Sequence, residues 1–254
     1  GKRFVVRFGR DIPEHGILRW HELAASRAAS AAGIAPRVHH AEPGVLVIEF
    51  VEAEPLSAAD VATAGMVEDL AQLLRRLHHG VPLHLSGPVL SFWVFHVLRG
   101  YARFLQDRQS PHVAQLPGLL ATADRLEAAI GPVRIVLGHN DLLPGNILHD
   151  GRQFWLIDWE YAGFGSPLFD LGGLASNNGF TVAQERQLLS AYFDTPVDDA
   201  LWRRYGAMKC ASLLRETLWS MVSEITSDLD FDYPAYTAEN LAAFKAACDD
   251  LQFQ

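Results

Sequence analysis

The pattern of hydrophobic and polar positions divides the chain into a short strand-rich part and a long helical part. Phe4, Val6 and Phe8 on one face predict a strand over 3–8, and the apolar run over 45–50 predicts a second strand. The Ala-rich segment 18–32 between them predicts a helix. Gly33 and Pro36 end that helix. A strand, a helix and a strand within about 50 residues form one small sheet-and-helix unit.

After Pro55 the pattern changes to helical spacing, interrupted by a few short strands. Helices are predicted over 58–79, 92–108 and 116–130, and short strands over 135–137, 147–148 and 154–157. From Pro167 onward the pattern is helical, with breaks at Gly179, Pro196 and Pro234. The pattern therefore predicts an α+β fold with a small β-rich N-terminal lobe over 1–52 and a larger, mainly helical C-terminal lobe over 53–254.

Composition and charge narrow the kinds of partner that the chain can have. The 254 residues are 49% hydrophobic and 20% charged, which is enough apolar material for two lobes that share one cleft. The formal net charge is −9 and Lys and Arg form no run, so we expect neither a nucleic-acid partner nor a membrane-surface partner. No apolar stretch approaches the ~20 residues that span a bilayer, so no membrane insertion is expected.

The two cysteines bear on the cellular compartment, and the first residue bears on whether the N-terminus is complete. Cys210 and Cys248 lie far apart and form no metal-binding or disulfide motif. Such sparse usage fits a reducing compartment, and we expect a cytoplasmic protein. The sequence opens on Gly1, almost inside the first predicted strand, and not on Met. We therefore expect that part of the natural N-terminus precedes it.

Candidate chemistry is concentrated in one short segment, 138–148, with the sequence GHNDLLPGNIL. Within it, His139, Asp141 and Asn146 follow the spacing H-x-D-x-x-x-x-N. Protein kinases use this spacing for a base that orients the attacking hydroxyl and for a ligand of Mg²⁺. A second metal-binding aspartate is expected after a nearby strand, and Asp158 directly follows one. The spacing predicts phosphoryl transfer with Asp141 as catalytic base and with Asn146 and Asp158 as metal ligands.

The same residues have a simpler interpretation as turn formers, because Asp, Asn, Pro and Gly are common in turns. The placement of Asp158 after the next strand favours the metal-site interpretation. His139 is a candidate catalytic residue by its position in the motif. A histidine at such a place more often braces the loop through hydrogen bonds than it transfers a proton, and Asp170 is expected to be a second brace.

The segment resembles the choline/ethanolamine kinase family, within the aminoglycoside-phosphotransferase group of the protein-kinase-like superfamily. That family carries H-N-D-x-x-x-x-N-I-L, then I-D-x-E-Y-A/S, and then F-D. The matching stretches here are 139–148, 157–162 and 169–170. Two further stretches, 218–220 and 230–236, are similar to the closing motif of the family. The resemblance covers most of the chain. It implies a protein-kinase-like two-lobed fold, with ATP and Mg²⁺ as cofactors.

In the N-terminal lobe, four residues are expected to contact the nucleotide. Arg7 matches the strand Arg or Lys that contacts the ATP phosphates, and Glu22 matches the helix glutamate that holds it. Glu49 and Val51 lie at the expected adenine hinge. An exposed surface charge is the alternative for Arg7 and Glu22, since a helix surface commonly carries Glu. The Gly-rich phosphate loop that the family places before the Arg7 strand is not in this sequence, which truncation or disorder would explain.

The resemblance also implies a pocket for the amine of the substrate, with Glu160, Tyr161, Trp219 and Tyr236 as candidate residues. Aromatic faces and a carboxylate recognise quaternary ammonium groups. Aromatic residues on a helix are as often part of the core, and this alternative stays open. Glu216 stands where choline kinases carry a second Trp, and its spacing from Trp219 places the two on one helix face. A carboxylate beside one aromatic suits a primary amine at least as well as choline.

We therefore expect an ATP- and Mg²⁺-dependent phosphotransferase that acts on the hydroxyl of a small amino alcohol such as choline or ethanolamine. Asn177 stands where the family often has an acidic residue, which is a second sign of an altered acceptor pocket. The alternatives are a related kinase for aminoglycosides, sugars or thiamine, and a kinase-shaped binding protein without turnover. The oligomeric state is open, with a homodimer as one option.

Overall fold

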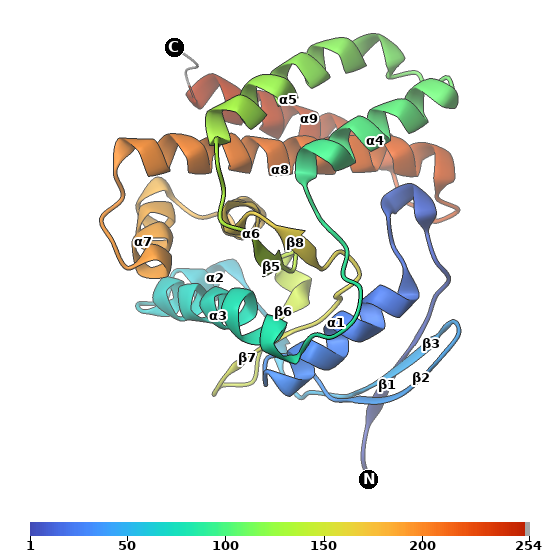
Figure 1. Cartoon of the computed structure of the whole chain (residues 1–254), viewed down its shortest axis with the longest axis vertical. Helices are drawn as coiled ribbons and strands as arrows, with labels where there is room; N and C mark the ends of the chain where they lie inside the picture. The colour runs from blue at the N-terminus through green and yellow to red at the C-terminus, as the bar shows by residue number, and fades with distance from the viewer. Residues whose placement is uncertain (252–254) are drawn as a thin grey trace. The chain divides into compact units, whose positions relative to one another are not determined.

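The computed structural model describes residues 1–251, and its helices and small antiparallel sheets confirm the α+β class (Figure 1). By packing, the chain forms two compact units. The first unit contains 1–92 and 135–197, and the second contains 93–134 and the chain from Asp198 onward. The expected lobe boundary near residue 52 falls inside the first unit. It stays a prediction, because packing units and functional lobes are different divisions of a chain.

The first unit opens with a three-stranded antiparallel sheet in the order β1-β3-β2. Its strands are β1 (Phe4–Phe8), β2 (Val38–Glu42) and β3 (Val45–Glu49). Strand β1 pairs with β3 so that Arg7 lies opposite Leu46. Helix α1 (Arg19–Ala31) packs against β2. This is the expected strand–helix–strand unit with one additional strand.

Two small antiparallel sheets carry the candidate loop. One has the order β4-β6-β7, and the other pairs β5 with β8. The strands are β4 (Glu54–Pro55), β5 (Val136–Gly138), β6 (Ile147–His149), β7 (Phe154–Leu156) and β8 (Gly163–Gly165). Because these strands are short, they mainly position the loops between them and contribute little to a core.

Helices and short 3₁₀ turns complete the first unit. They are α2 (Ala58–Val61), α3 (Met66–Gly80), α6 (Pro167–Asn177), α7 (Val182–Phe193), η1 (Pro13–His15), η2 (Val81–His84) and η4 (Pro144–Asn146). Helix α3 contacts α7, α6 and β5, and its Leu70, Leu74 and Leu77 are buried. Each fully buried leucine contributes about 1.5–3 kcal/mol, so α3 is central to the core of this unit.

The second unit is helical throughout its described part (Figure 1). Its elements are α4 (Val94–Asp107), η3 (Val113–Gln115), α5 (Leu116–Ile130), α8 (Asp199–Thr226) and α9 (Tyr233–Asp250). Helix α8 packs against α4, α5 and α9, and Leu98, Leu126 and Leu214 are fully buried. The long helix α8 therefore organises the core of the second unit.

Differences from the predicted elements have local causes. The helix predicted over 58–79 is two helices, because Gly65 has a left-handed φ of 86° at the start of α3. Pro234 does not break a helix; it lies in the first turn of α9, where its missing N–H is not needed. The hydrophobic pattern does not predict β2, β4 or β8, since they are short or polar, as His39 and His40 in β2 illustrate.

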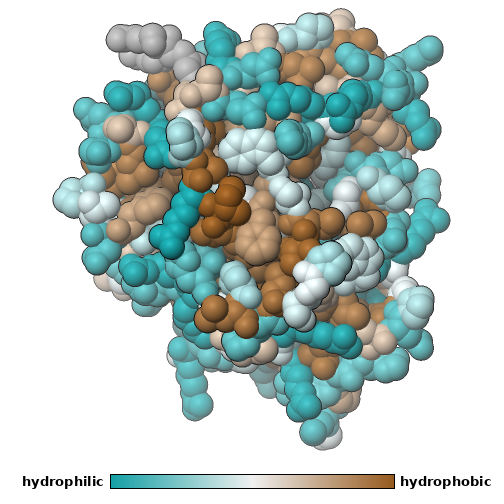
Figure 2. All heavy atoms as spheres, in the orientation of Figure 1, coloured by the Kyte–Doolittle hydropathy of each residue, from teal (hydrophilic) through white to brown (hydrophobic). Residues whose placement is uncertain are grey.

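The surface mixes hydrophilic and hydrophobic side chains. Figure 2 shows hydrophilic side chains over much of one face, with hydrophobic side chains exposed among them. None of the helices within residues 1–251 is long and apolar enough to cross a membrane.

Candidate active site

The segment with the candidate chemistry is a tight loop between β5 and β6. Strand β6 pairs with β7 so that Ile147 lies opposite Leu156. Next to this residue pair, the amide of Ile157 donates to the carbonyl of Asn146 at 3.1 Å. This pairing brings Asp158, the next residue, alongside Asn146. The β6–β7 hairpin is thus the reason that two residues twelve positions apart in the chain become neighbours.

Asp141 and Asn146 are joined directly within the loop. The side-chain amide of Asn146 donates to the backbone carbonyl of Asp141 at 2.9 Å and to its carboxylate at 3.1 Å. Because the amide nitrogen is used in these bonds, the amide oxygen is the atom left for a metal ion. Both residues are half-buried, so they are held in place and can still be reached by a ligand.

A buried carboxylate, Asp170, holds the start of the loop. It accepts hydrogen bonds from the backbone amides of His139 at 2.8 Å and Asn140 at 2.7 Å, and from Nε2 of His78 at 3.0 Å. Burial acts to raise the pKa of Asp170, but the hydrogen bond and charge of His78 and the contact with His139 hold that pKa below its usual value. Asp170 therefore braces the loop as an anion.

His139 is fully buried and acts through hydrogen bonds. Its Nε2 donates to the carbonyl of Ile157 at 2.9 Å, and its ring lies 4.8 Å from that of Trp159, centroid to centroid. Burial lowers the pKa of His139, which favours the neutral ring. Its Nδ1 has no hydrogen-bond partner within residues 1–251. A neutral imidazole in this position links the loop to the end of the β6–β7 hairpin.

Two residues of the site have left-handed backbone conformations. Asn140 and Asp158 both have a φ of 66°. Asn and Asp tolerate this region better than other L-residues, which explains their presence at the two turns. Asn140 is held there because its side-chain amide donates to the carbonyl of Tyr161 at 2.9 Å.

Arg7, near the end of β1, contacts three carboxylates. Its guanidinium donates to Glu22 at 2.5 Å, to Glu160 at 2.6 Å and to Asp158 at 2.7 Å. Burial lowers the pKa of Arg7, but the charges of Asp158, Glu22 and Glu160 together raise it above its usual value. The expected pair of Arg7 and Glu22 is present, and the same arginine also reaches the aspartate expected to bind metal.

A second arginine, Arg19, joins the same carboxylates. It donates to Glu22 at 2.6 Å and to Glu160 at 2.9 Å. Burial and the neighbouring Asp158 raise the pKa of Glu160, against the opposing effect of the two arginines. The sequence motifs do not single out Arg19. The only local signal is its position three residues before Glu22, on the same face of α1.

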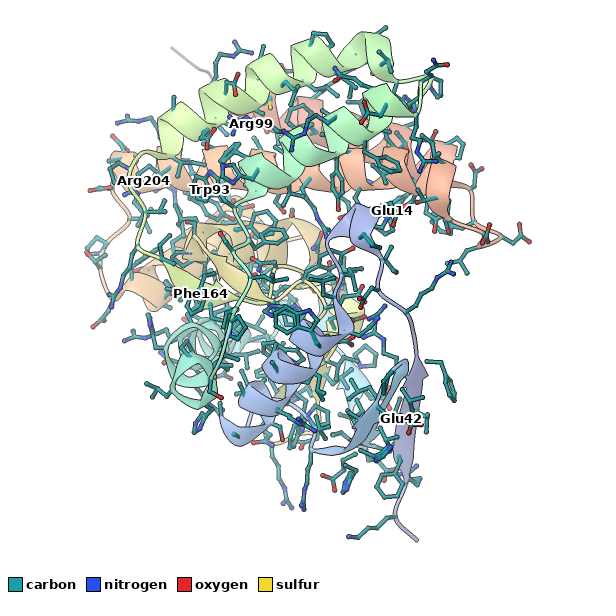
Figure 3. All side chains as sticks on the ribbon, turned by 45° about the vertical axis from the view of Figure 1, so that its right-hand side comes forward. Glu14, Glu42, Trp93, Arg99, Phe164 and Arg204 are labelled. Carbon is teal, nitrogen blue, oxygen red and sulfur yellow. The ribbon has the colours of Figure 1, made fainter. Side chains whose placement is uncertain are left out.

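A cavity of about 980 Å³ borders these charged residues within the first unit. Its lining comes from β1, the loop after β1, the start of α1 and the β2–β3 hairpin, and includes Arg7, Arg19 and Glu22. Glu42, labelled in Figure 3, lies on the hairpin part of this lining. The volume is typical of a small-molecule pocket.

The candidate hinge residues lie at the end of the same sheet. Glu49 is the last residue of β3, and its backbone amide donates to the carbonyl of Arg37 at 2.8 Å. Val51 follows it in an irregular segment and is half-buried. Their contact with a nucleotide stays a prediction.

The candidate acceptor residues are divided between the two units. Tyr161 is buried in the first unit, whereas Glu216, Trp219 and Tyr236 belong to the second. There the hydroxyl of Tyr236 donates to Glu216 at 2.9 Å, and burial together with Glu216 raises the pKa of Tyr236. The rings of Trp219 and Tyr233 lie 6.2 Å apart. Three of the candidate residues thus share one acidic and aromatic cluster on α8 and α9.

Residues 1–207 match the phosphotransferase enzyme family. The chain belongs to this family. Protein LicA of Haemophilus influenzae is 24% identical over 254 residues, which is 96% of this chain and 94% of that protein. Ethanolamine kinase 1 of Mus musculus is 25% identical over 270 residues, covering 91% of this chain and 73% of that protein. A solved structure of a choline/ethanolamine kinase family protein from Mesorhizobium loti has a TM-score of 0.80 at 28% identity, covering 97% of this chain and 82% of that one.

These similarities confirm the predicted family, the protein-kinase-like fold and the class of reaction, phosphoryl transfer to an alcohol group.

The oxygen donors of this phosphotransferase suit Mg²⁺ that binds together with phosphates. Within residues 1–251, no group of three or more His, Cys, Asp or Glu is arranged to hold a metal ion on its own. Magnesium is usually held by one or two carboxylates, with substrate phosphates and water completing its octahedron. The carboxylate of Asp158 and the amide oxygen of Asn146 are hard ligands of this kind, so the residues fit the ion.

Proposed function

We propose that this phosphotransferase is an ATP- and Mg²⁺-dependent kinase that phosphorylates the hydroxyl of a small amino alcohol such as choline or ethanolamine. The observation that carries the proposal is the contact of Arg7 with Asp158 at 2.7 Å. It joins the strand arginine suited to phosphate contact with the aspartate suited to metal binding, next to the loop of Asp141 and Asn146. Relatives named as ethanolamine or choline/ethanolamine kinases support the acceptor class.

In the proposed reaction, Asp141 accepts or orients the proton of the acceptor hydroxyl. The amide of Asn146 fixes the direction of that carboxylate. Arg7, held by Glu22, neutralises charge on the phosphates, and Glu49 and Val51 contact the adenine. A Mg²⁺ ion held by Asn146 and Asp158 would supply charge neutralisation on the transferred group.

His139 has a supporting part in this scheme. Its buried ring donates to the carbonyl of Ile157, so it holds the loop against the hairpin that carries Asp158. Moving a proton to the substrate would require this ring to give up that hydrogen bond in a buried site.

We further propose that Glu216, Trp219 and Tyr236 recognise the amine. The part that the resemblance implies for Tyr161 and Glu160 stays a prediction. An aromatic face and a carboxylate attract an ammonium group, and a primary ammonium can also donate hydrogen bonds to Glu216. Trimethylammonium has no such donors. Ethanolamine or another primary amino alcohol is therefore as well suited as choline.

An ATP-consumption screen tests the proposed function. It covers choline, ethanolamine, other small amino alcohols, aminoglycosides, sugars and thiamine, each with and without Mg²⁺. We expect Mg²⁺-dependent turnover with an amino alcohol. Turnover confined to the other acceptors would assign a related kinase, and MgATP binding without turnover on any acceptor would indicate a kinase-shaped binding protein.

The substitution Asp141→Asn tests the mechanism on the acceptor that the screen identifies. We expect turnover to fall by about 10²–10⁴-fold, since a general base is lost, while MgATP affinity is nearly unchanged. Asp107→Asn, at the exposed end of α4, is the matched control and should leave both quantities unaltered. Wild-type turnover in the Asp141 variant would remove that residue from the role of base.

A further inference from the structure

Four charged side chains of the first unit form a closed ring. Arg7 donates to Glu22 at 2.5 Å and to Glu160 at 2.6 Å. Arg19 donates to the same two carboxylates, to Glu22 at 2.6 Å and to Glu160 at 2.9 Å. Each glutamate is therefore shared by two guanidinium groups, and the ring as a whole is neutral.

Asp158 adds a third carboxylate to this ring through Arg7, at 2.7 Å. The group then carries three negative and two positive charges, a net charge of −1. If Arg19 were absent, three carboxylates would face Arg7 alone, with a net charge of −2. The side chains of Glu22 and Glu160 are only 3% and 15% exposed, so water compensates little of that charge.

Two hydrogen bonds to the segment before α1 hold Arg19 in place. Its Nε donates to the carbonyl of Arg10 at 2.9 Å, and its own backbone amide donates to Asp11 at 2.7 Å, where α1 begins. A side chain on Gly9 would approach the Arg19 guanidinium at 3.1 Å, so the glycine leaves it room. Arg19 is thus seated in a prepared place and is not a mobile surface charge.

We propose that Arg19 is a positioning residue for phosphoryl transfer, which balances Glu22 and Glu160 so that Arg7 keeps positive charge available for the ATP phosphates. This inference rests on the proposed function. Two mechanisms contribute. Arg19 holds the second carboxylate oxygen of Glu22 and shares Oε2 of Glu160 with Arg7, which fixes the direction of the Arg7 guanidinium. It also lowers the negative charge that a triphosphate would meet at this site.

The test is steady-state kinetics of Arg19→Gln and Arg19→Lys with MgATP as the varied substrate. For Arg19→Gln we expect KM for MgATP to rise about 10- to 100-fold, the effect of losing a pair of charge-assisted hydrogen bonds. The KM for the acceptor should change far less. Arg19→Lys keeps the charge without the planar fork, so it should recover part of the MgATP affinity.

A double variant separates the effect of the net charge of the group from the effect of the hydrogen bonds that Arg19 makes. Arg19→Gln combined with Glu160→Gln returns the net charge of the group to −1, and it should lower KM for MgATP relative to Arg19→Gln alone. The matched control is Arg99→Gln, because Arg99 bridges Asp124 and Glu127 between α4 and α5 in the second unit (Figure 3). That variant should leave KM for MgATP unchanged.

The outcomes distinguish this inference from the proposed function. If Arg19→Gln lowers the melting temperature but leaves KM for MgATP at the wild-type value, as Arg99→Gln would, then Arg19 is only structural and the inference is overturned. If the wild-type protein binds MgATP without turnover, the proposed function fails. Calorimetric MgATP affinities of the same variants then decide the inference. If the wild-type protein does not bind MgATP at all, both are overturned.

Discussion

At the scale of single residues, the candidate loop depends on side chains that bind backbone groups. The amides of His139 and Asn140 lie just past the end of β5, where no strand partner accepts from them. Buried amides need acceptors, and the carboxylate of Asp170 supplies both. The same carboxylate is held from α3 by His78, whose other ring nitrogen contacts the hydroxyl of Tyr192. One buried acid thus connects the loop to two helices of the core.

We predict that Asp170→Asn destabilises the protein by roughly 1–3 kcal/mol, because one of the two backbone amides would face the NH₂ group in place of an acceptor. Turnover should fall further than the folded fraction explains, since the Asp141 loop begins at these amides. Urea unfolding and kinetics of the folded variant measure the two effects. A variant with wild-type stability and turnover would show that the loop does not need this brace.

The stability that Asp170 contributes depends on pH in a defined direction. The pKa of Asp170 in the folded protein lies below its usual value of about 4, so the unfolded chain takes up the proton first. The contribution of Asp170 to stability is therefore complete above about pH 4 and is lost as the pH falls through the lower folded value. The gap in unfolding free energy between the wild type and Asp170→Asn should be constant near neutral pH and shrink in acid.

The proximities that the sequence predicts are those between residues whose partners are near in the chain. Asp141 and Asn146 have a fixed spacing, and Asp158 follows the next strand, so local pattern is enough. Arg19 is different, because its second carboxylate, Glu160, lies 141 positions away. No spacing rule connects such residues. Only the packing of α1 beside the loop brings them together.

At the scale of elements, the β5–β8 ladder supports the loop from the other side. Gly165 lies opposite Val136, and Gly138, the last residue of β5, directly precedes His139. Phe164, labelled in Figure 3, also bonds to the segment before α4, accepting from the amide of Phe92 at 2.8 Å. This close approach leaves no space at Gly165, where a Cβ atom would lie 2.3 Å from the carbonyl oxygen of Phe92.

We predict that Gly165→Ala destabilises the protein by about 1–3 kcal/mol, because the clash is with backbone and must shift the ladder. Turnover should fall with it, as the shift is passed to the start of the loop. Gly80→Ala is the control: a Cβ there meets nothing within 4 Å, so it should be neutral or slightly stabilising. Equal melting temperatures for the two variants would contradict the prediction.

Regular apolar spacing predicts helices such as α5 correctly, but it does not predict which residues of two helices face each other. Cys210 and Cys248 show what is missing. They are unrelated by any motif, yet α8 and α9 pack so that Cys248 is a hydrogen-bond partner of Cys210, which together with burial raises the pKa of Cys210. Close by, a Cβ atom added at Gly206 of α8 would lie 3.0 Å from the side chain of Leu251, the residue that follows α9. Such pairings depend on the packing of whole helices.

At the scale of the whole molecule, net charge bears on the proposed binding of a nucleotide. The protein carries a net charge of −9, and the ring of Arg7, Arg19, Glu22 and Glu160 with Asp158 contributes −1 at the site. A free triphosphate is repelled by such a surface, and a divalent cation that accompanies it offsets the repulsion. Binding of ATP should therefore depend on Mg²⁺ before any chemistry occurs.

We predict that ATP and Mg²⁺ together raise the melting temperature by roughly 5–10 °C at about 100 times the dissociation constant, because a ligand that binds only the folded state stabilises it by about 2.7 kcal/mol at that excess. ATP alone or Mg²⁺ alone should give much smaller shifts. In Asp158→Asn the increment due to Mg²⁺ should be lost, since the one carboxylate of the proposed metal site is neutralised, whereas Asp107→Asn should respond as the wild type does. Thermal unfolding by calorimetry measures the wild type and both variants without ligand, with ATP, with Mg²⁺ and with both. A full ATP shift without Mg²⁺, or one that survives in Asp158→Asn, would mean that Asp158 does not hold the ion and that its contact with Arg7 has another purpose.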